Sequence, residues 1–295
     1  MKPDMKTMFR PASLLAMLGI LTTVACKKEA VDSGFSANEN LSNVSASAVM
    51  AAAAVNSNLS VNWDNYAHGV TYTSTNASTD FGNVNGWVNS RGMISNGNLR
   101  VTLAPNALSG AGGIVSNVDI EDGSAYELDY TIRFHSQFDW SRGGKVGFGF
   151  AIGDGNAGGD PAWDGNGGTL RMMWYRNDAG RVYFQPYVYF KDQSGQYGED
   201  WGLTYPATGS INRGQTYHVH MYIKSNTGSS TNGRCQILID GNVLVDKTIR
   251  WTTNDAKRLI RTLTFHTFRG GSQDYWMSST EGYIYYDDLV VHKIQ

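Results

Sequence analysis

The chain has 295 residues, a formal net charge of −2 at pH 7, 12% aromatic residues and only 17% charged residues. Its 34 glycines amount to about 12% of the chain, against about 7% in average proteins. This composition favours many strands and tight turns, and it excludes a coiled coil, a helical bundle, a disordered chain and a collagen-like fibre. Because there is no basic excess, we expect no nucleic-acid partner.

The first 25 residues have the features of an export signal. Lys2, Lys6 and Arg10 precede an apolar run over 14–24 that is too short to be a permanent membrane span. Cys26 follows Thr-Val-Ala, which resembles a bacterial lipobox, so we expect Cys26 to be acylated after signal cleavage. The alternative is an ordinary signal peptide. We expect an exported protein, held at an outer membrane or cell surface by its lipid alone, or secreted.

The residues from 26 to 60 are rich in Ala, Ser and Asn and predict a flexible tether, which leaves 61–295 as one large β domain. The chain has only two cysteines. If Cys26 is acylated, Cys235 has no partner for a disulfide. Cys235 lies in an apolar run, and we expect it to be a small buried hydrophobic residue.

From residue 61 onward the sequence alternates between apolar and polar residues, as half-buried strands do. The predicted strands cover residues 126–134, 146–152, 170–175, 182–190, 217–224, 235–239, 243–245, 259–268 and 283–291. Asp240-Gly241 predicts a tight hairpin. Because no long helical periodicity interrupts these strands, we expect an all-β sandwich of two antiparallel sheets.

Two segments carry residues that could hold a metal. The glycine-rich loop over 153–168 contains four candidate calcium ligands, which are Asp154, Asn156, Asp160 and Asp164. Their spacing is not that of an EF-hand and no Glu follows, so turn chemistry is the favoured interpretation and structural calcium the alternative. His218 and His220 would share one strand face, but no third zinc ligand is evident. We expect no required cofactor.

The polar face of the strand over 182–190 is the most informative pattern. Tyr183, Gln185, Tyr187 and Tyr189 follow one another on it, and tyrosine offers a sugar both a stacking surface and a hydroxyl. An ordinary exposed sheet face is the alternative. No strand carries the paired carboxylates of a glycoside hydrolase, which makes hydrolysis the less favoured reaction.

Short motifs in a fixed order between residues 99 and 291 indicate a family. They are Phe-Asp-Trp at 138–140, Gly-Gly-Lys at 143–145, Leu-Arg-Met-Met-Trp at 170–174, Tyr-Val-Tyr at 187–189, Tyr-Gly-Glu-Asp at 197–200, Asn-Gly at 232–233, Phe-His-Thr-Phe-Arg-Gly-Gly at 265–271 and Asp-Asp at 287–288. This series resembles polysaccharide lyase family 14 and the glucuronan lyases of family 20. The resemblance implies a β-jelly roll, a concanavalin-like sandwich, that cleaves uronic-acid polymers such as alginate by β-elimination.

The resemblance also implies the catalytic residues, which are Lys145, Arg171, Tyr187 and Tyr189. Elimination removes the weakly acidic C5 proton of a uronate, and neutralising the neighbouring carboxylate stabilises the intermediate. We therefore expect Arg171 to bind that carboxylate. We expect Tyr189 to transfer the proton, with Tyr187 and Lys145 as alternatives.

Five further residues are predicted to bind the substrate. They are Thr169, Gln185, Tyr183, His266 and Arg269, of which Thr169 stands where the family often has Ser. The family usually continues Gly-Gly-Lys with Leu-Pro-Gly, whereas this chain has Val-Gly-Phe at 146–148. The polymer therefore stays open between mannuronate, guluronate and glucuronate. We expect a monomer that acts on an acidic polysaccharide, and the alternatives are a non-catalytic glycan-binding module and a jelly-roll glycoside hydrolase.

Overall fold

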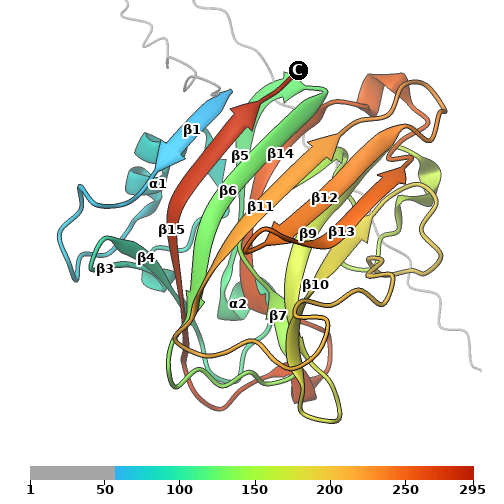
Figure 1. Ribbon diagram of the computed structural model, residues 1–295. Helices are drawn as coiled ribbons and strands as arrows, with labels where there is room; N and C mark the ends of the chain where they lie inside the picture. Colours follow the sequence, from blue (N-terminus) through green and yellow to red (C-terminus); the bar gives the residue numbers. More distant parts are fainter. Residues whose placement is uncertain (1–56) are drawn as a thin grey trace, which may run out of the picture. The chain divides into compact units, whose positions relative to one another are not determined.

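A computed structural model describes residues 57–295 (Figure 1). The predicted export signal over 1–25, the lipid-bearing Cys26 and nearly all of the predicted tether over 26–60 lie outside the described residues. The first strand begins at Asn58, close to the expected start of the domain. Among the described residues, no helix is long and apolar enough to cross a membrane.

The described residues form two antiparallel sheets. The larger has eight strands in the order β13-β12-β11-β6-β15-β4-β3, with β1 paired to β15. These strands are β1 Asn58–Val61, β3 Gly92–Ser95, β4 Asn98–Leu103, β6 Ala125–Phe134, β11 Thr216–Lys224, β12 Gly233–Ile239, β13 Asn242–Ile249 and β15 Gly282–Lys293. Every strand pair within it is antiparallel.

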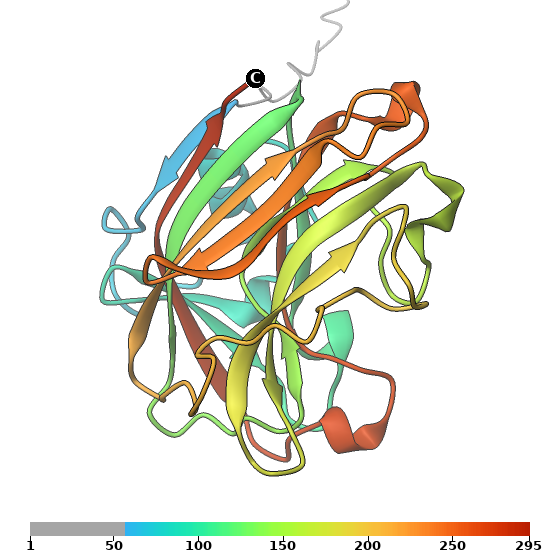
Figure 2. The ribbon, with the colours of Figure 1, turned by 45° about the vertical axis from the view of Figure 1, so that its right-hand side comes forward.

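The smaller sheet has seven strands in the order β10-β9-β7-β14-β5-β2, with β8 paired to both β9 and β14. They are β2 Val84–Asn85, β5 Ile114–Gly123, β7 Gly143–Lys145, β8 Phe148–Gly153, β9 Gly167–Arg176, β10 Val182–Tyr189 and β14 Ile260–Arg269. The short helices are α1 Ser74–Phe81, α2 Ser109–Gly112, η1 Asn89–Arg91, η2 Ala162–Asp164, η3 Asp255–Lys257 and η4 Asp274–Trp276. Figure 2 shows the two layers, with β11 to β13 in orange and β9 and β10 in yellow. The expected sandwich of two antiparallel sheets is confirmed.

The core between the sheets is rich in aromatic rings. Phe148 of the smaller sheet stacks on Phe265 with 4.5 Å between ring centroids. Tyr130 and Tyr286 of the larger sheet meet Phe148 edge-on at 5.4 and 6.1 Å. Offset and edge-to-face contacts of this kind add to the free energy gained from burial alone, because ring edges and faces carry opposite partial charges. The core thereby fixes the positions of the inward side chains of β8 and β14. Because side chains alternate along a strand, the outward side chains of these strands are fixed as well.

The predicted hairpin and the predicted buried cysteine are both confirmed. β12 and β13 are joined by Asp240 and Gly241, whose φ angles are 49° and 76°. Two positive φ values define the type I′ turn, which matches the twist of the strands it joins. Cys235 is fully buried and free, and burial raises the pKa of its thiol to about 12.

The strand predicted over 146–152 begins two residues later, as β8, and residues 146–147 form a break between β7 and β8. The break lies at Gly147, whose φ is +81° and where an added Cβ would stand 2.3 Å from the hydroxyl oxygen of Tyr130. Only glycine adopts this conformation readily in so tight a space. Because the chain bends here, Lys145 stays in register with Met173 of β9 and Phe268 of β14.

Candidate active site

A cavity of about 500 Å³ opens on the outward face of the smaller sheet. Seven residues on its strands line this cavity, which are Lys145, Arg171, Met173, Tyr175, Gln185, Tyr187 and Phe268. The segments that connect the strands add to the lining, among them the loop with Tyr197 and the segment around η4 with Tyr275 and Trp276. A cavity of this size with a few converging polar groups is the usual form of a small-ligand or substrate site.

Strand register brings the predicted residues together. In the pairing of β9 with β10, Tyr187 lies opposite Arg171 and Gln185 lies opposite Met173. Lys145 of β7 lies opposite Met173 on the other side. Residues two apart on a strand share a face, so these two rows stand side by side on one surface. Tyr187 and Arg171, 16 positions apart in the chain, are therefore direct neighbours.

Lys145 is a buried amine with weak partners. Its side chain belongs to a residue only 7% exposed, and Nζ donates to Sδ of Met173 at 3.3 Å. The same Nζ lies 3.4 Å from the ring centroid of Tyr187. Burial, followed by the nearby charge of Arg171, holds the pKa of Lys145 well below its usual value. A lysine in this state supplies a neutral amine that can accept a proton.

Arg171 is a buried guanidinium that lacks an anionic partner. Arg171 is 5% exposed, and its Nη1 meets Nδ1 of His266 at 3.5 Å. Nε and Nη2 have no hydrogen-bond partner among the described residues. Burial lowers its pKa from the ordinary value, yet a guanidinium remains protonated in proteins. An uncompensated buried charge is costly, and this one is placed to receive a carboxylate.

His266 holds Arg171 in place from the far side. Its Nε2 lies 3.2 Å from Oδ1 of Asn117, on β5. Burial, with the charges of Arg171 and Lys145, lowers the pKa of His266 to about 3. The ring is therefore neutral, and the contacts fit a tautomer in which Nε2 donates to Asn117 while Nδ1 accepts from Arg171. The histidine steers the guanidinium without adding a third positive charge.

The two tyrosines differ in what their hydroxyls do. Tyr187 lines the cavity, and burial, with Tyr189 beside it, raises the pKa of its hydroxyl. Tyr189 is fully buried and does not line the cavity, and its hydroxyl accepts from the amide of Gly159 at 3.1 Å. Each ring centroid lies 5.5 Å from the guanidinium carbon of Arg171. Both rings thus pack against the guanidinium, but only Tyr187 lines the cavity.

Of the five predicted substrate-binding residues, only Gln185 lines the cavity. His266 contacts Arg171 and is absent from the lining, and the other three lie elsewhere. Thr169 is buried and donates to the carbonyl of Asn156 at 2.9 Å, which holds the glycine-rich loop. Tyr183 shares the outward face but packs beneath Arg181, whose guanidinium carbon is 4.7 Å from the ring centroid. Arg269 points between the sheets, where it donates to the carbonyl of Asp139 at 3.3 Å.

The position of Arg269 follows from strand geometry. It stands three residues after His266 on β14, and an odd separation places two side chains on opposite faces of a sheet. Burial confirms this, because Arg269 is 1% exposed and packs on Phe138 of the core, 5.4 Å from the ring centroid. The expectation that His266 and Arg269 share one groove therefore does not fit the structure.

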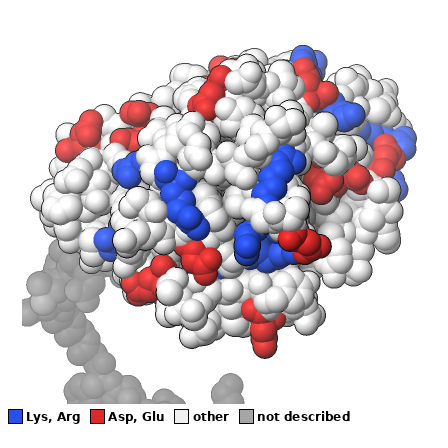
Figure 3. Space-filling view, turned by 60° about the horizontal axis from the view of Figure 1, so that its bottom comes forward, with Lys and Arg blue, Asp and Glu red and all other residues white. Residues whose placement is uncertain are grey.

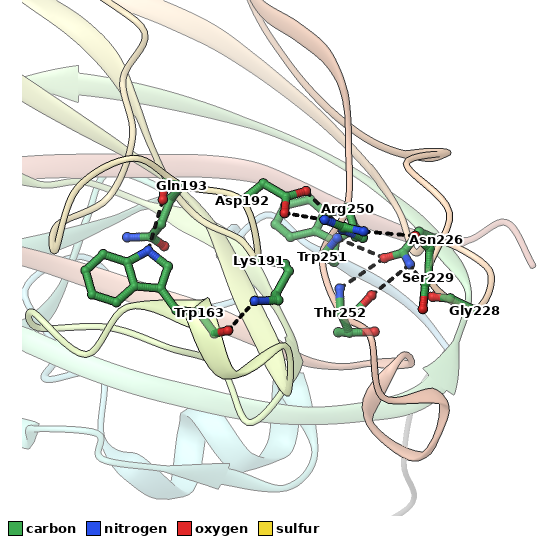
Figure 4. A network of polar contacts seen from close by, with 10 residues as sticks. All are labelled: Trp163, Lys191, Asp192, Gln193, Asn226, Gly228, Ser229, Arg250, Trp251 and Thr252. Atoms are coloured by element: carbon green, nitrogen blue, oxygen red, sulfur yellow. Dashed lines mark hydrogen bonds and ion pairs between the residues drawn. The ribbon is translucent and has the colours of Figure 1, made fainter.

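A network of polar contacts fastens the loop that carries Tyr197 (Figure 4). Gln193 is its centre, with Nε2 donating to the carbonyl of Tyr197 at 3.1 Å and Oε1 accepting from the amide of Phe190 at 3.1 Å. The indole of Trp163 donates to the carbonyl of Gln193 at 2.9 Å. The same loop is tied to the larger sheet by Asp192, which receives Arg250 at 2.6 and 3.0 Å. This wall of the cavity is therefore firmly held.

The glycine-rich loop uses its polar side chains for turns and local pairs. Asp154 pairs with Lys257 at 2.5 Å, and Asp164 accepts from Asn166 at 2.8 Å. Between residues 57 and 295 no group of three or more His, Cys, Asp or Glu is arranged to hold a metal ion. His218 and His220 instead contact the carboxylate of Asp129 at 3.2 and 3.1 Å. The turn-chemistry interpretation of the loop accounts for these contacts, and structural calcium stays a prediction.

Sequence reasoning did not single out several residues of the site. Asn117 belongs to no motif, and Met173 was given no role although it stands in the motif at 170–174, two residues after Arg171 on the same face. Tyr197, Tyr275 and Trp276 stand on loops, whose positions no strand pattern predicts. Met173 could have been predicted, because alternate residues of a strand share one face and Met173 lies two residues after Arg171.

Comparison with known proteins gives a consistent result. A family model described as polysaccharide lyase 14 matches residues 106–289. The solved structure of alginate lyase Aly36B is 68% identical, covers 82% of this chain and 99% of its own, and superposes with a TM-score of 0.81. An alginate lyase from Aplysia kurodai is 18% identical over 81% of this chain and all of its own, with a TM-score of 0.62, which shows the fold. A comparison with curated proteins gave no match.

Proposed function

The chain belongs to polysaccharide lyase family 14 and is a polysaccharide lyase, and we propose that it cleaves alginate by β-elimination in the cavity around Lys145 and Arg171. One observation carries this proposal. A guanidinium and an amine, 5 and 7% exposed, stand side by side in an open cavity without a single carboxylate partner among the described residues. Such a pair is complementary to a polymer that carries one carboxylate on every sugar.

Arg171 neutralises the carboxylate of the sugar that reacts. Its free Nε and Nη2 form one edge of the guanidinium, which matches the two oxygens of a carboxylate. When the C5 proton leaves, charge spreads into that carboxylate, and a fixed cation there lowers the barrier. His266 and Asn117 keep the guanidinium oriented before the substrate arrives.

Lys145 is better suited than either tyrosine to take the C5 proton. Burial makes its amine easier to deprotonate, whereas burial makes the Tyr187 hydroxyl harder to deprotonate. The Tyr189 hydroxyl, which the sequence favoured, is occupied by the amide of Gly159 and does not reach the cavity. Geometry therefore favours Lys145 as the base, with Tyr187 as a neutral hydrogen-bond donor to the sugar.

The proposed reaction balances without any cofactor. The C5–H bond breaks and its proton passes to Nζ of Lys145, while the electron pair forms the C4–C5 double bond. The C4–O bond breaks, and the leaving oxygen receives a proton from the ammonium of Lys145 or from Tyr187. If Lys145 serves both steps it ends as the neutral amine in which it began. Gln185, which lines the same cavity beside Met173, is placed to orient sugar hydroxyls.

The oligosaccharide complexes of Aly36B support the same three positions. One complex, with an alginate tetrasaccharide, carries alanine in place of a lysine and a tyrosine, and another, with a trisaccharide, in place of a lysine and a methionine. The replaced lysine, methionine and tyrosine are separated by 28 and then 14 residues. Lys145, Met173 and Tyr187 have the same separations here.

The proposal is tested by incubating the purified domain with alginate, polymannuronate, polyguluronate and glucuronan. We expect ultraviolet absorbance from unsaturated products with alginate, and its loss in Lys145→Ala while Lys224→Ala, an exposed lysine of the larger sheet, retains it. Reducing ends without absorbance would instead identify a hydrolase. Saturable binding without chain shortening would identify a glycan-binding module.

We also propose that the chain is exported and anchored through a lipid on Cys26. The basic residues, the apolar run over 14–24 and the Thr-Val-Ala-Cys sequence support this. Labelling of the full chain with radioactive palmitate in a bacterial host is expected to mark the wild type and not Cys26→Ala. Labelling that persists in Cys26→Ala would contradict the anchor.

A further inference from the structure

A second cavity adjoins the first at Tyr275. This neighbouring cavity has a volume of about 640 Å³, and Tyr275 lines both it and the first. We call it the distal pocket; its lining includes Ser141, Arg142, Arg176 and Asn177. A chain that leaves the first cavity along Tyr275 therefore enters a second hollow on the same side of the protein.

An aromatic wall joins the two cavities. Trp276 packs so closely on Gly271 that a Cβ there would stand 2.2 Å from the indole nitrogen, and it also contacts Tyr175 at 5.8 Å between ring centroids. Tyr275 stacks on Trp276 at 6.0 Å and is 66% exposed. Trp276 is therefore held rigidly, while Tyr275 offers a free ring face at the junction. Exposed aromatic rings on a fixed support are suited to stack against the apolar face of a sugar.

The distal pocket is lined by two arginines and two aspartates, and one of the arginines has no partner for its side chain within residues 57–295. Arg176, at the end of β9, forms no ion pair or side-chain hydrogen bond among the described residues. Arg142 pairs with Asp178, but that carboxylate is 92% exposed and its pull is weakened by water. The remaining acid, Asp139, already accepts from Ser278 at 2.7 Å and from the amide of Ser141 at 3.0 Å.

The surface around the distal pocket has the same character. Figure 3 brings forward the end of the protein that lies at the bottom of Figure 1, where the β9–β10 turn and η4 are found. Several Lys and Arg side chains gather over the middle of this face, and acidic side chains lie around them. Arg181 stands on the β9–β10 turn, and among the described residues its guanidinium is bound by the carbonyls of Ala207 and Gly209 and by no carboxylate.

We propose that the distal pocket is a second uronate-binding site, in which Arg176, assisted by Arg142, binds the carboxylate of a sugar several residues away from the bond that is cleaved, with Tyr275 stacking on the sugar between. This inference rests on the proposed lyase function. It assigns the distal pocket to affinity for long chains and leaves the chemistry to Lys145 and Arg171. The enzyme would then favour polymer over short oligomers.

The test compares kcat/KM on a series of alginate oligomers of increasing length for the wild type, Arg176→Gln, Tyr275→Ala and a control, Arg234→Gln. Arg234 is an exposed arginine of the larger sheet, paired with Asp246 at 2.7 Å. We expect Arg176→Gln to lower kcat/KM about fivefold on long oligomers, through KM, and to leave short oligomers unchanged. Tyr275 also lines the first cavity, so Tyr275→Ala should lower kcat/KM on every length, and more on long oligomers than on short ones. The arginine effect should shrink as salt is added, because exposed charges are screened.

The outcomes separate the inference from the proposed function. An equal loss on all lengths, or no loss on long oligomers, would overturn the distal site while wild-type activity still supports the lyase. A wild type that produces no unsaturated sugar from any polyuronate would overturn the proposed function itself. In that case calorimetry can measure the binding of long and short oligomers to the wild type and to Arg176→Gln. The comparison still reports whether Arg176 distinguishes chain length.

Discussion

The outward faces of the two sheets use the same residue types in opposite ways. On the larger sheet, charged side chains pair across strands at the surface, as Arg234 does with Asp246 and His220 with Asp129. On the smaller sheet, Lys145 and Arg171 are buried beside each other and meet no carboxylate among the described residues. The first arrangement is self-sufficient, whereas the second is complete only when an anion is present.

The difference teaches where to look for function on a β-sandwich. Both faces alternate apolar and polar residues with a period of two, so the pattern alone treats them alike. What separates them is the loops that wall the smaller sheet, which remove water from its polar residues without supplying counter-charges. Residues that a protein buries at a cost in stability, with no partner of its own, are functional candidates.

Removing the buried amine of Lys145 is expected to have the largest effect on activity. Lys145→Ala should lower kcat by about 10³-fold or more, because it removes the proposed base. Circular dichroism should show an unchanged fold. A variant that keeps more than a tenth of the wild-type activity would contradict the contrast between the two sheets, since the buried Lys145 would then matter no more to activity than a surface lysine.

Keeping the charge of the guanidinium but changing its shape sharpens the comparison. Arg171→Lys should lower kcat/KM about 10²-fold, because an ammonium cannot bind a carboxylate at two points. Arg234→Lys on the larger sheet, the matched control, should change nothing measurable. If both lysine variants behave like the wild type, the guanidinium of Arg171 is not reading a carboxylate.

The pH dependence tests which group loses its proton. Since Lys145 has a depressed pKa and acts as the unprotonated amine, kcat/KM should rise with pH through that pKa, well below the usual value of a lysine. His266, with a pKa of about 3, is neutral throughout this range and should add no second limb. A single rise centred at or above the ordinary lysine pKa would show that Lys145 is not activated by burial.

Burial of the Lys145 amine should lower the free energy of unfolding of the wild type. Lys145→Met, which fits beside Met173, should raise the free energy of unfolding at neutral pH by about 1 kcal/mol. The sign follows from linkage, because the unfolded chain binds a proton at Lys145 that the folded chain resists. Wild-type stability should therefore rise as pH increases toward the ordinary lysine pKa, and this slope should be absent in Lys145→Met. Urea denaturation at several pH values measures both.

The smallest effect is expected on the larger sheet. The hydrogen bond to Asp129 raises the pKa of His220, so this pair stabilises the fold at pH values below the ordinary histidine pKa. That contribution is lost as pH rises through the raised pKa. His220→Asn should cost a few tenths of a kcal/mol at pH 5 and less at pH 8. A loss well above 1 kcal/mol at pH 5 would mean that paired surface charges matter here as well.

Several features of the fold and site follow from local sequence. The strand over 182–190 was predicted with the correct face, because its alternation is unbroken. The hairpin at Asp240 was predictable because one dipeptide determines its turn. Lys145, Arg171 and Tyr187 were predicted from motifs. Their convergence could not be predicted in the same way, because it depends on strand register, which pairs residues far apart in the chain.

Other features depend on contacts that the sequence does not display. The break at Gly147 arises because the ring of Tyr130, from the opposite sheet, occupies the space of a side chain. The hydroxyl of Tyr189 is taken by a loop amide, which no strand pattern could reveal. Arg269 is the instructive error, since counting by twos from His266 already places it on the other face.

The unpaired edge of Arg171 also has a consequence for turnover. β-Elimination breaks a glycosidic bond but leaves the carboxylate of the reacting sugar intact, so under the proposed function the guanidinium would hold the product through the same two contacts that bound the substrate. Departure of the unsaturated fragment must then compete with that grip. An enzyme built in this way is expected to be slowed by its own products, and moderate ionic strength should relieve the slowing by loosening the bound fragment.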